Sequence, residues 1–366
     1  MNGEPLIQVP GCVSACRACK GKSAPYFETV EAKLRWSGRY LENWREFTRP
    51  VQVSHKPLYY RERILLHVEG DADCGYCFGL YQDEAVLPIP ECPLHEPSYN
   101  QALERLRLYL PRGLPLRFVH SNRQQLTLVF KCAPFELDGD AWRPVFDLLA
   151  QTPWQGMTFD FNPAAGRRVF SAKTRRLIWG TDQSQVKCAG QSFTYGPVCF
   201  LQNDYTLYAS AIAQSAAFLN QGTAYLDLYC GIGMSTAVIR SGRPTLAVEV
   251  SGESLRHARG QVEGAEFLQG TIENRLPQIK QFADRFESLD VFVNPSRLGV
   301  GRAVIRTFET DLNNVARVAY LSCHPRSLSE DLVEFEAVGF QVVSVWPYDF
   351  FPRTGHIEQL VLLERK

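Results

Sequence analysis

The 366-residue sequence lacks an excess of charge of either sign, because it holds 39 lysine and arginine residues and 39 aspartate and glutamate residues. A formal net charge of zero leaves no overall field to hold the protein on nucleic acid, so any contact with RNA or DNA must come from local patches. Low-complexity segments and repeats of fixed period are also lacking. With 45% hydrophobic residues, the chain is expected to form two or three ordinary domains.

Long hydrophobic runs are missing as well. No apolar stretch approaches the length of a membrane span, and the first residues, MNGEPLIQVPGC, lack the charged start and apolar core of a signal peptide. We therefore expect a cytoplasmic protein with no membrane partner. The eleven cysteines form an odd number, which in such a protein indicates free thiols, metal or cluster ligands, or a nucleophile.

The carboxyl-terminal half alternates buried strand patterns with helical ones. The strand-like runs are AYLDLYC (224–230), PTLAVEV (244–250), SLDVFVNP (288–295) and VARVAYLSC (315–323). Residues 340–351 and 357–365 suit a terminal antiparallel hairpin. The pattern predicts an α/β domain over residues 191–366, with a mostly parallel sheet and a site at the carboxyl ends of its strands.

Residues 51–190 have a different character, with short strand-like pieces and one helical pattern, SYNQALERLRLYL. They predict a separate central α+β domain. Within it, the segment GRRVFSAKTRRLIWG places five cations among aromatic residues with no acid between them: Arg167, Arg168, Lys173, Arg175 and Arg176. The segment is interpreted either as a basic hairpin that binds RNA phosphates or as an exposed strand with solubilising charges.

Two glycines, Gly231 and Gly233, follow the strand-like run at 224–230, but the third glycine of a dinucleotide fingerprint is missing. This disfavours a hydride-transfer enzyme. Glu249, at the end of the next strand, lies at a distance that suits a ribose diol. The layout is typical of Rossmann-like class I S-adenosylmethionine (SAM) methyltransferases, in which Tyr229 would flank the cofactor. The alternative is a turn that only links a strand to a helix.

Cys323 ends a strand-like run just before a helix-start signature, in which Ser327 and Glu330 match a capping box. One interpretation makes Cys323 a small buried hydrophobe. The other makes it a nucleophile, with its pKa lowered by the helix dipole and nearby cations.

Taken in order, five motifs resemble those of the RNA uracil-5 methyltransferase family, and particularly its 23S ribosomal RNA branch. They are CFLQND (199–204), DLYCGIG (227–233), VNPSRLGVG (293–301), SCHPRSLSEDL (322–332) and YDFFPRTGHIEQLVLLER (348–365). The resemblance implies that Cys323 is the nucleophile and Glu358 the general base. It also implies cofactor and substrate contacts by Gln202, Tyr229, Glu249 and Asn294.

These residue types suit the chemistry. Carbon 5 of uracil is a weak nucleophile, and a thiolate that adds to carbon 6 makes carbon 5 electron-rich enough to accept a methyl group. A base must then remove the carbon 5 proton. Arg297 is a candidate to bind a phosphate or to stabilise the enolate oxygen; its alternative role is that of a helix-cap partner, as Glu358 could be a solvated strand residue.

Cys12, Cys16 and Cys19 lie close together at the front of the chain, with Cys92 distant in a Cys-Pro-Leu context. Four such thiolates are a plausible [4Fe-4S] ligand set, and the resemblance implies a cluster. A zinc site from Cys16, Cys19, Cys74 and Cys77 is one alternative. The C-x3-C-x2-C spacing of radical SAM enzymes is another.

The expected protein is therefore a monomeric RNA methyltransferase that does not act on DNA. It has an iron–sulfur segment (1–50), a central RNA-binding domain (51–190) and a SAM-dependent methyltransferase domain (191–366). The expected product is 5-methyluridine in 23S ribosomal RNA, made from an unstacked uridine. Transfer RNA is the alternative substrate, and a non-catalytic RNA-binding iron–sulfur protein with a vestigial methyltransferase fold is the alternative function.

Overall fold

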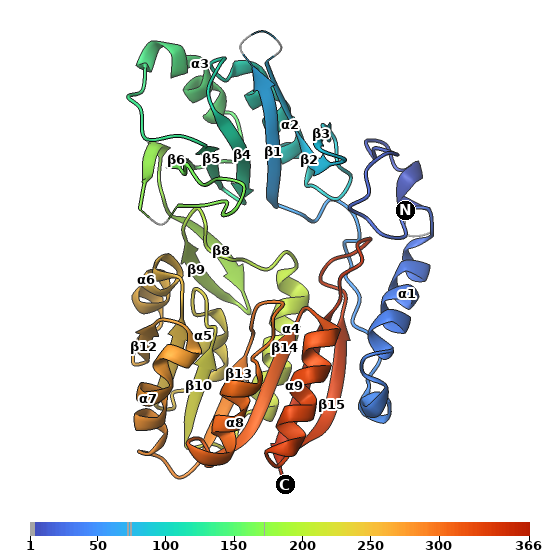
Figure 1. Ribbon diagram of the computed structural model, residues 1–366, viewed down its shortest axis with the longest axis vertical. Helices are drawn as coiled ribbons and strands as arrows, with labels where there is room; N and C mark the ends of the chain where they lie inside the picture. Colours follow the sequence, from blue (N-terminus) through green and yellow to red (C-terminus); the bar gives the residue numbers. More distant parts are fainter. Residues whose placement is uncertain (1–3, 72, 74, 172) are drawn as a thin grey trace. The chain divides into compact units, whose positions relative to one another are not determined.

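The computed structural model describes residues 4–71, 73, 75–171 and 173–366. The chain forms two compact units (Figure 1). The first comprises residues up to 27 together with 56–184 and 195–203, and the second comprises 28–55, 185–194 and 204–366. The divisions expected at residues 50 and 190 differ from these units, because 28–55 and 185–194 group with the carboxyl-terminal part of the chain.

The first unit is built on a mixed sheet with the strand order β3-β2-β1-β4-β5-β6-β7. Helices α2 (Pro97–Tyr109) and α3 (Gly139–Leu149) pack on one face and bury a core of aliphatic and aromatic side chains. The unit thus has the expected α+β character. Its strands are β1 (Arg63–Asp71), β2 (Gly75–Gln82), β3 (Ala85–Pro88), β4 (Leu116–Asn122), β5 (Gln125–Phe130), β6 (Gly156–Phe161) and β7 (Arg175–Gly180).

The basic segment at 167–180 is not a hairpin, as one interpretation had it. Only its second half is a strand, β7, which pairs with β6. The first half turns back over the sheet, and the Asn162 side chain fastens it by donating to the carbonyl of Arg168 (2.7 Å). Arg175 pairs with the buried carboxylate of Asp160 (3.4 Å), so part of the expected positive charge is offset.

The second unit contains a sheet with the order β12-β11-β10-β13-β14-β16-β15. Its first five strands are parallel, and β16 is antiparallel to both β14 and β15, which confirms the expected parallel sheet with a terminal hairpin. The strands are β10 (Ala224–Leu228), β11 (Thr245–Glu249), β12 (Glu266–Gln269), β13 (Leu289–Val293), β14 (Val315–Ser322), β15 (Phe340–Tyr348) and β16 (Glu358–Arg365). A small separate sheet pairs β8 (Ser184–Cys188) with β9 (Gln191–Tyr195).

Helices cover both faces of this sheet, which is why its central strands are apolar throughout. Leu246 and Val248 of β11 point into a core shared with α7, α8 and α9, whereas Ala247 between them contacts Leu255 of α6. The helices of this unit are α1 (Tyr26–Gly38), α4 (Tyr205–Phe218), α5 (Met234–Ile239), α6 (Gly252–Gln261), α7 (Ile272–Ala283), α8 (Arg302–Thr310) and α9 (Pro325–Ala337), with the short 3-10 turn η2 (Glu42–Phe47). A second 3-10 turn, η1 (Leu6–Gln8), belongs to the first unit.

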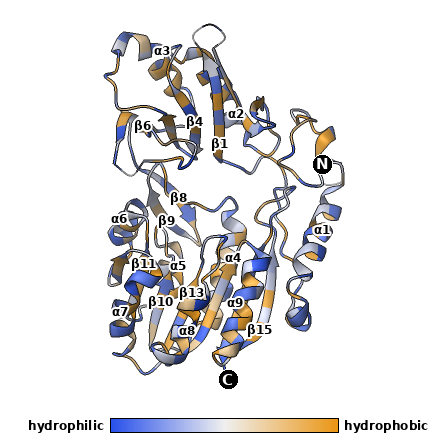
Figure 2. Cartoon of the chain, viewed as in Figure 1, coloured by the Kyte–Doolittle hydropathy of each residue, from blue (hydrophilic) through white to orange (hydrophobic). Residues whose placement is uncertain are grey.

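The helices of the second unit carry both hydrophilic and hydrophobic stretches (Figure 2), as expected for helices with one side in a core. The sequence interpretation passed over β12, α7 and α8. β12 is only four residues long, and α7 contains Pro277, so neither carries a strong pattern. Within the described part of the chain, no helix is long and apolar enough to cross a membrane.

Candidate active site

The sheet topology of the second unit brings several predicted residues to one edge. β10 lies between β11 and β13, so the strand order reverses beside β10, where ligands bind in open α/β sheets. Tyr229 follows β10, Glu249 ends β11, Asn294 follows β13, and Cys323 follows β14. Because β16 runs antiparallel to β14, its first residue, Glu358, starts at this same edge.

The two glycines of the turn after β10 serve different purposes. Gly231 has φ +56°, and a Cβ there would meet nothing within 4 Å, which leaves open space beside the turn. Gly233 has φ +86°, and a Cβ would lie 3.0 Å from Val262 and 3.2 Å from Ala258, so this glycine permits close packing. The free space at Gly231 fits the approach of a cofactor to the backbone.

Glu249 orders the same turn. Its Oε2 accepts from the Gly231 N–H (3.1 Å), and its Oε1 accepts from the Ser251 N–H (2.6 Å). Gln261 holds the turn from the other side, by donating to the carbonyl of Ile232 (2.7 Å) and accepting from the N–H of Thr194 in β9 (2.7 Å). Sequence reasoning missed Gln261, because a glutamine in a helical pattern carries no signal of its partners.

Cys323, Glu358 and Arg297 are the candidate reactive side chains at this edge, and the charges of the last two act on the Cys323 thiol. Burial and, next, the Glu358 carboxylate raise the pKa of the Cys323 thiol to about 11, against the lowering effect of Arg297. The expectation that the helix dipole and cations lower this pKa is therefore wrong. The reason is that burial and a neighbouring acid outweigh them.

Glu358 is buried at 3% exposure, and its Oε2 has no hydrogen-bond partner among the described residues. Burial raises its pKa from 4.5 to about 8, against the lowering effect of Arg297. A carboxyl group with this pKa changes protonation state near neutral pH, which is the property of a general acid or base. The solvated role considered for Glu358 is therefore wrong.

The helix after Cys323 begins earlier than the capping box indicated. Its N-cap is His324, followed by Pro325, and the His324 side chain accepts from the Ser327 N–H (3.4 Å). The Ser327 hydroxyl instead donates to the carbonyl of Arg297 (3.0 Å). Glu330 pairs with Arg326 (3.1 Å). Proline tolerated at the first helical position explains the earlier start.

Asp331 of α9 holds the loop that carries Asn294 and Arg297. It accepts from the N–H groups of Val300 (2.7 Å) and Gly301 (3.0 Å) and from the Tyr320 hydroxyl (2.7 Å). The guanidinium of Arg297 also lies 3.3 Å from His356 Nε2. Arg297 therefore contacts the loop before Glu358 rather than serving as a helix-cap partner.

Helix α1 supports the loop that leads into Glu358. Lys33 is 3% exposed, and its Nζ lies 2.5 Å from the Asp349 carboxylate and 2.8 Å from the carbonyl of Phe351. Trp36, one turn further along α1, makes an edge contact with the His324 ring. Helix α1 thus contacts the segments next to both Cys323 and Glu358. The sequence analysis did not predict these contacts.

Gln202 belongs to the first unit, unlike the other predicted cofactor contacts. It is 6% exposed, and its Oε1 has no hydrogen-bond partner among the described residues. Tyr229 has φ +70° and is partly buried against the core, and burial raises the pKa of its hydroxyl.

The front cysteines are neighbours without forming a recognisable ligand set. Gly11 (φ +84°) approaches the Glu91 carbonyl so closely that a Cβ would lie 2.0 Å from it, which places Cys12 beside the segment of Cys92. Burial is the main cause that raises the pKa of Cys19 to about 12, and Cys92, Cys16 and Cys12 contribute to the rise. Even so, no three potential ligand side chains among the described residues are arranged to hold a metal ion.

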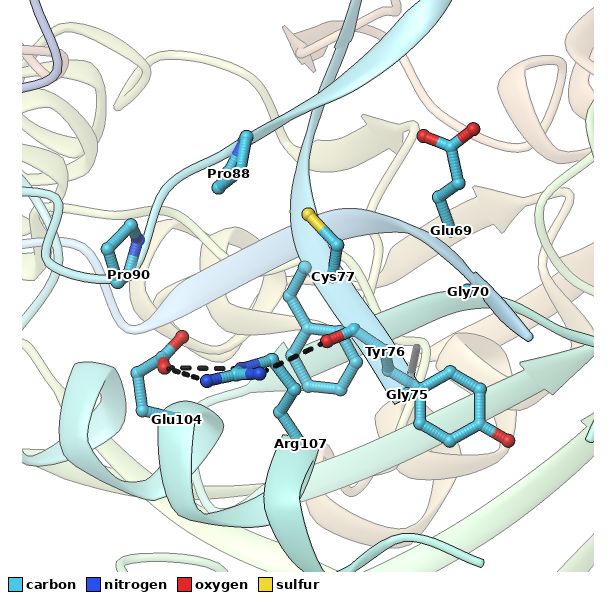
Figure 3. A pocket seen from close by; sticks show the side chains of 10 residues that line it. Glu69, Gly70, Gly75, Tyr76, Cys77, Pro88, Pro90, Glu104 and Arg107 are labelled. Atoms are coloured by element: carbon cyan, nitrogen blue, oxygen red, sulfur yellow. Dashed lines mark hydrogen bonds and ion pairs between the residues drawn. The ribbon is translucent and has the colours of Figure 1, made fainter. Parts of the chain in front are cut away.

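Cys77 lies elsewhere in the first unit, and Cys74 lies outside the described residues. Cys77 lines a pocket of about 650 Å³ together with Glu69 and Arg107 (Figure 3). The Arg107 guanidinium in this pocket pairs with Glu104 (3.0 Å) and donates to the carbonyl of Tyr76 (3.3 Å). The zinc site considered from the sequence is thus not formed by the described cysteines.

Comparison with known proteins identifies the type of fold and family. The family model described as tRNA (uracil-5-)-methyltransferase matches residues 167–366. A solved tRNA (uracil-54, C5)-methyltransferase of Pyrococcus abyssi, in complex with S-adenosyl-L-homocysteine, superposes with a TM-score of 0.71 at 18% identity, covering 96% of this chain and 87% of that one. This likeness shows a shared fold.

Curated relatives match over most of their length. An uncharacterized RNA methyltransferase of Protochlamydia amoebophila is 30% identical over 84% of this chain and 70% of its own length. An uncharacterized RNA methyltransferase of Gloeobacter violaceus is 28% identical, covering 96% of this chain and 81% of its own. The 23S rRNA (uracil(747)-C(5))-methyltransferase RlmC of Halothiobacillus neapolitanus is 24% identical, covering 96% and 97%.

Proposed function

The chain belongs to the tRNA (uracil-5-)-methyltransferase family, and from this premise we propose that it methylates carbon 5 of one uridine in 23S ribosomal RNA through a covalent adduct on Cys323. The observation that carries the proposal is the half-buried Cys323 beside the buried Glu358 at the carboxyl ends of the strands. The Glu358 carboxylate helps to raise the pKa of the Cys323 thiol, and burial raises the pKa of Glu358 itself to about 8. Such a pair is typical of an acid–base site.

The steps follow from these groups. The Cys323 proton passes to solvent water as the thiolate forms, and the sulfur bonds to carbon 6 of the uracil, so that the electron pair of the double bond moves to an enolate near the Arg297 guanidinium. SAM, when bound, would supply the electrophilic methyl group. Carbon 5 would accept this group as its bond to the sulfonium sulfur breaks, leaving S-adenosylhomocysteine. The Glu358 carboxylate then takes the carbon 5 proton, the double bond between carbons 5 and 6 re-forms, and the sulfur leaves as thiolate.

The cofactor site is proposed around the turn at Gly231. The residues fit SAM, because the space beside Gly231 is open and Glu249 lies at the end of the neighbouring strand. Glu249 would accept from the ribose hydroxyls, Tyr229 would flank the cofactor, and Asn294 can both donate and accept hydrogen bonds. From the resemblance of CFLQND to the family's motif, Gln202 is also proposed as a cofactor contact.

Ribosomal RNA is favoured over transfer RNA by two observations. The RlmC of Halothiobacillus neapolitanus matches over 96% of this chain and 97% of its own, and the front cysteines resemble those of the ribosomal branch. The P. abyssi enzyme is a tRNA (uracil-54, C5)-methyltransferase, so transfer RNA is kept as the second candidate. We further propose that Cys12, Cys16, Cys19 and Cys92 bind a [4Fe-4S] cluster.

The function is tested by trapping and by mapping. An oligonucleotide with 5-fluorouridine at the target position lacks the carbon 5 proton, so the adduct should persist and peptide mapping should find it on Cys323. Cys323→Ala should lose the adduct and methylation while SAM still binds, and the control Cys132→Ala should keep both. An adduct on another residue would refute the mechanism. Mapping 5-methyluridine in ribosomal and transfer RNA, with and without the gene, separates the two substrates.

A further inference from the structure

One face of the sheet in the first unit is covered by α2 and α3, and the other is partly open. Along β1, Ile64, Leu66 and Val68 point into the helix-covered core. Arg63, Leu65 and His67 alternate with them and so lie on the other face. Residues 165–170 cover that face only in part, where Ala165 and Phe170 pack on Phe118 and Val129.

The open part of this face carries exposed rings. Tyr81 of β2 is 52% exposed and Phe200 is 56% exposed. Leu65, which lies between Arg63 and His67 on β1, is 38% exposed. The His67 ring stacks on Tyr81, with centroids 5.5 Å apart. His67 pairs across the strands with Gly79, whose lack of a side chain leaves room for that stack.

Cations accompany the rings. The Arg63 guanidinium lies 5.0 Å from the Phe200 ring centroid, and that of Arg117 lies 5.9 Å from the Tyr81 centroid. Arg117 forms no ion pair within the described residues. Burial and Arg117 both lower the pKa of His67, so His67 is a neutral ring at pH 7.

Exposed rings beside the Arg117 guanidinium match the two parts of single-stranded RNA, because its bases stack on aromatic rings and its phosphates are attracted to cations. Arg63 and His67 are four residues apart along β1, so the row spans roughly 13 Å, or about two nucleotides.

We propose that this open face, formed by Arg63, Leu65, His67, Tyr81, Arg117 and Phe200, binds an unpaired stretch of the substrate RNA. Bases stack on Tyr81 and Phe200, and Arg117 binds a phosphate. The proposal rests on the proposed function and assigns part of RNA recognition to a surface other than the basic segment at 167–176.

Fluorescence anisotropy with a labelled twelve-nucleotide oligouridine tests the binding. Tyr81→Ala should weaken binding about 5- to 100-fold, the usual range for one base stacked on a ring. Arg117→Ala should reduce the slope of log K against log salt by about 0.7, as expected for one phosphate contact on a single strand. The matched controls, Tyr109→Ala and Arg105→Ala, change exposed residues of α2 on the covered side and should leave both quantities unchanged.

Photocrosslinking of the unaltered protein to 4-thiouridine oligonucleotides gives a second measurement that does not depend on how a variant folds. Crosslinks on Tyr81 or Phe200 support the proposal. Crosslinks confined to other surfaces, or equal affinity of Tyr81→Ala and Tyr109→Ala, would overturn it. If wild type fails to methylate any RNA yet binds oligouridine through Tyr81, the proposed function fails and this binding face stands.

Discussion

Cys323 and the front cysteines place the same side chain in two different environments. Burial is the main cause that raises the pKa of both Cys323, to about 11, and Cys19, to about 12. The next cause differs. For Cys323 it is the carboxylate of Glu358, whereas for Cys19 it is the neighbouring thiol of Cys92. Each site also has a guanidinium that lowers the pKa of the thiol: Arg297 does so for Cys323, and Arg61 for Cys19.

The difference shows what each thiol needs before it can react. Cys323 faces one acid that takes up or releases its proton near pH 8, so a reversible covalent bond can form when a substrate arrives. The front thiols oppose one another's ionisation, so a multivalent cation is the group that would relieve their repulsion. The first arrangement suits a nucleophile, and the second suits cluster ligands.

The largest expected effect comes from removing the acid beside Cys323. Glu358→Gln should lower the turnover of methylation about 10³-fold, within the range for loss of a general base. Because the carbon 5 proton then stays in place, the methylated RNA should remain attached to Cys323. Denaturing gels of the protein with labelled RNA would show this adduct.

Glu287→Gln is the matched control, since Glu287 is exposed in the same unit, and it should turn over normally. Free methylated RNA released at the wild-type rate by Glu358→Gln would contradict the assignment. A variant that forms no adduct would instead place Glu358 in the first step, and the comparison between the two cysteine sites would need revision.

The sequence was sufficient to place Cys323, Glu358 and the glycine turn, because strand ends and short motifs are local. It was insufficient for the pKa of Cys323, which depends on how deeply the folded chain buries the thiol. It also gave no sign of the pair between Lys33 and Asp349, which are 316 residues apart. A lysine in a helical pattern is normally solvated, and only the fold shows that this one is buried.

The buried pair of Lys33 and Asp349 gives a second test of the comparison, because it anchors the loop before Glu358 rather than the segments of the front cysteines. Lys33→Met removes the cation paired with Asp349 and should lower the free energy of unfolding by about 3 kcal/mol, as for other broken buried pairs. It should also lower kcat roughly tenfold with the affinity for SAM unchanged, since the loop before Glu358 loses an anchor. Chemical denaturation and steady-state kinetics measure the two effects.

Lys33→Arg should recover part of the rate, which a purely structural loss would not predict. Lys280→Met is the control, because Lys280 forms an exposed pair with Asp284 (2.9 Å) and should change neither quantity. If Lys33→Met loses stability and keeps full kcat in its folded fraction, Lys33 does not position the catalytic loop.

The front thiols give a smaller expected effect on methylation. Cys92→Ser should abolish the broad visible absorbance of anaerobically purified protein while methylation stays within about tenfold of wild type, because a cluster at this site has no step in the proposed chemistry. Cys132→Ser, which alters a half-buried thiol outside both sites, should keep the absorbance. A colourless wild-type protein with stoichiometric zinc would refute the cluster.

The smallest effect is the most direct measure of how the two environments differ. Iodoacetamide reacts with thiolate, so alkylation of Cys323 should rise about tenfold per pH unit up to its pKa near 11. Glu358 is largely neutral below its pKa of about 8, so wild type and Glu358→Gln should react alike there. Above pH 8 the wild-type carboxylate is charged and opposes formation of the thiolate, so the variant should react roughly three- to tenfold faster.

The thiol of Cys19, whose pKa depends on other cysteines, is the internal control and should react identically in both proteins. Equal rates of Cys323 alkylation in the two proteins above pH 8 would show that the charge of Glu358 does not affect the sulfur.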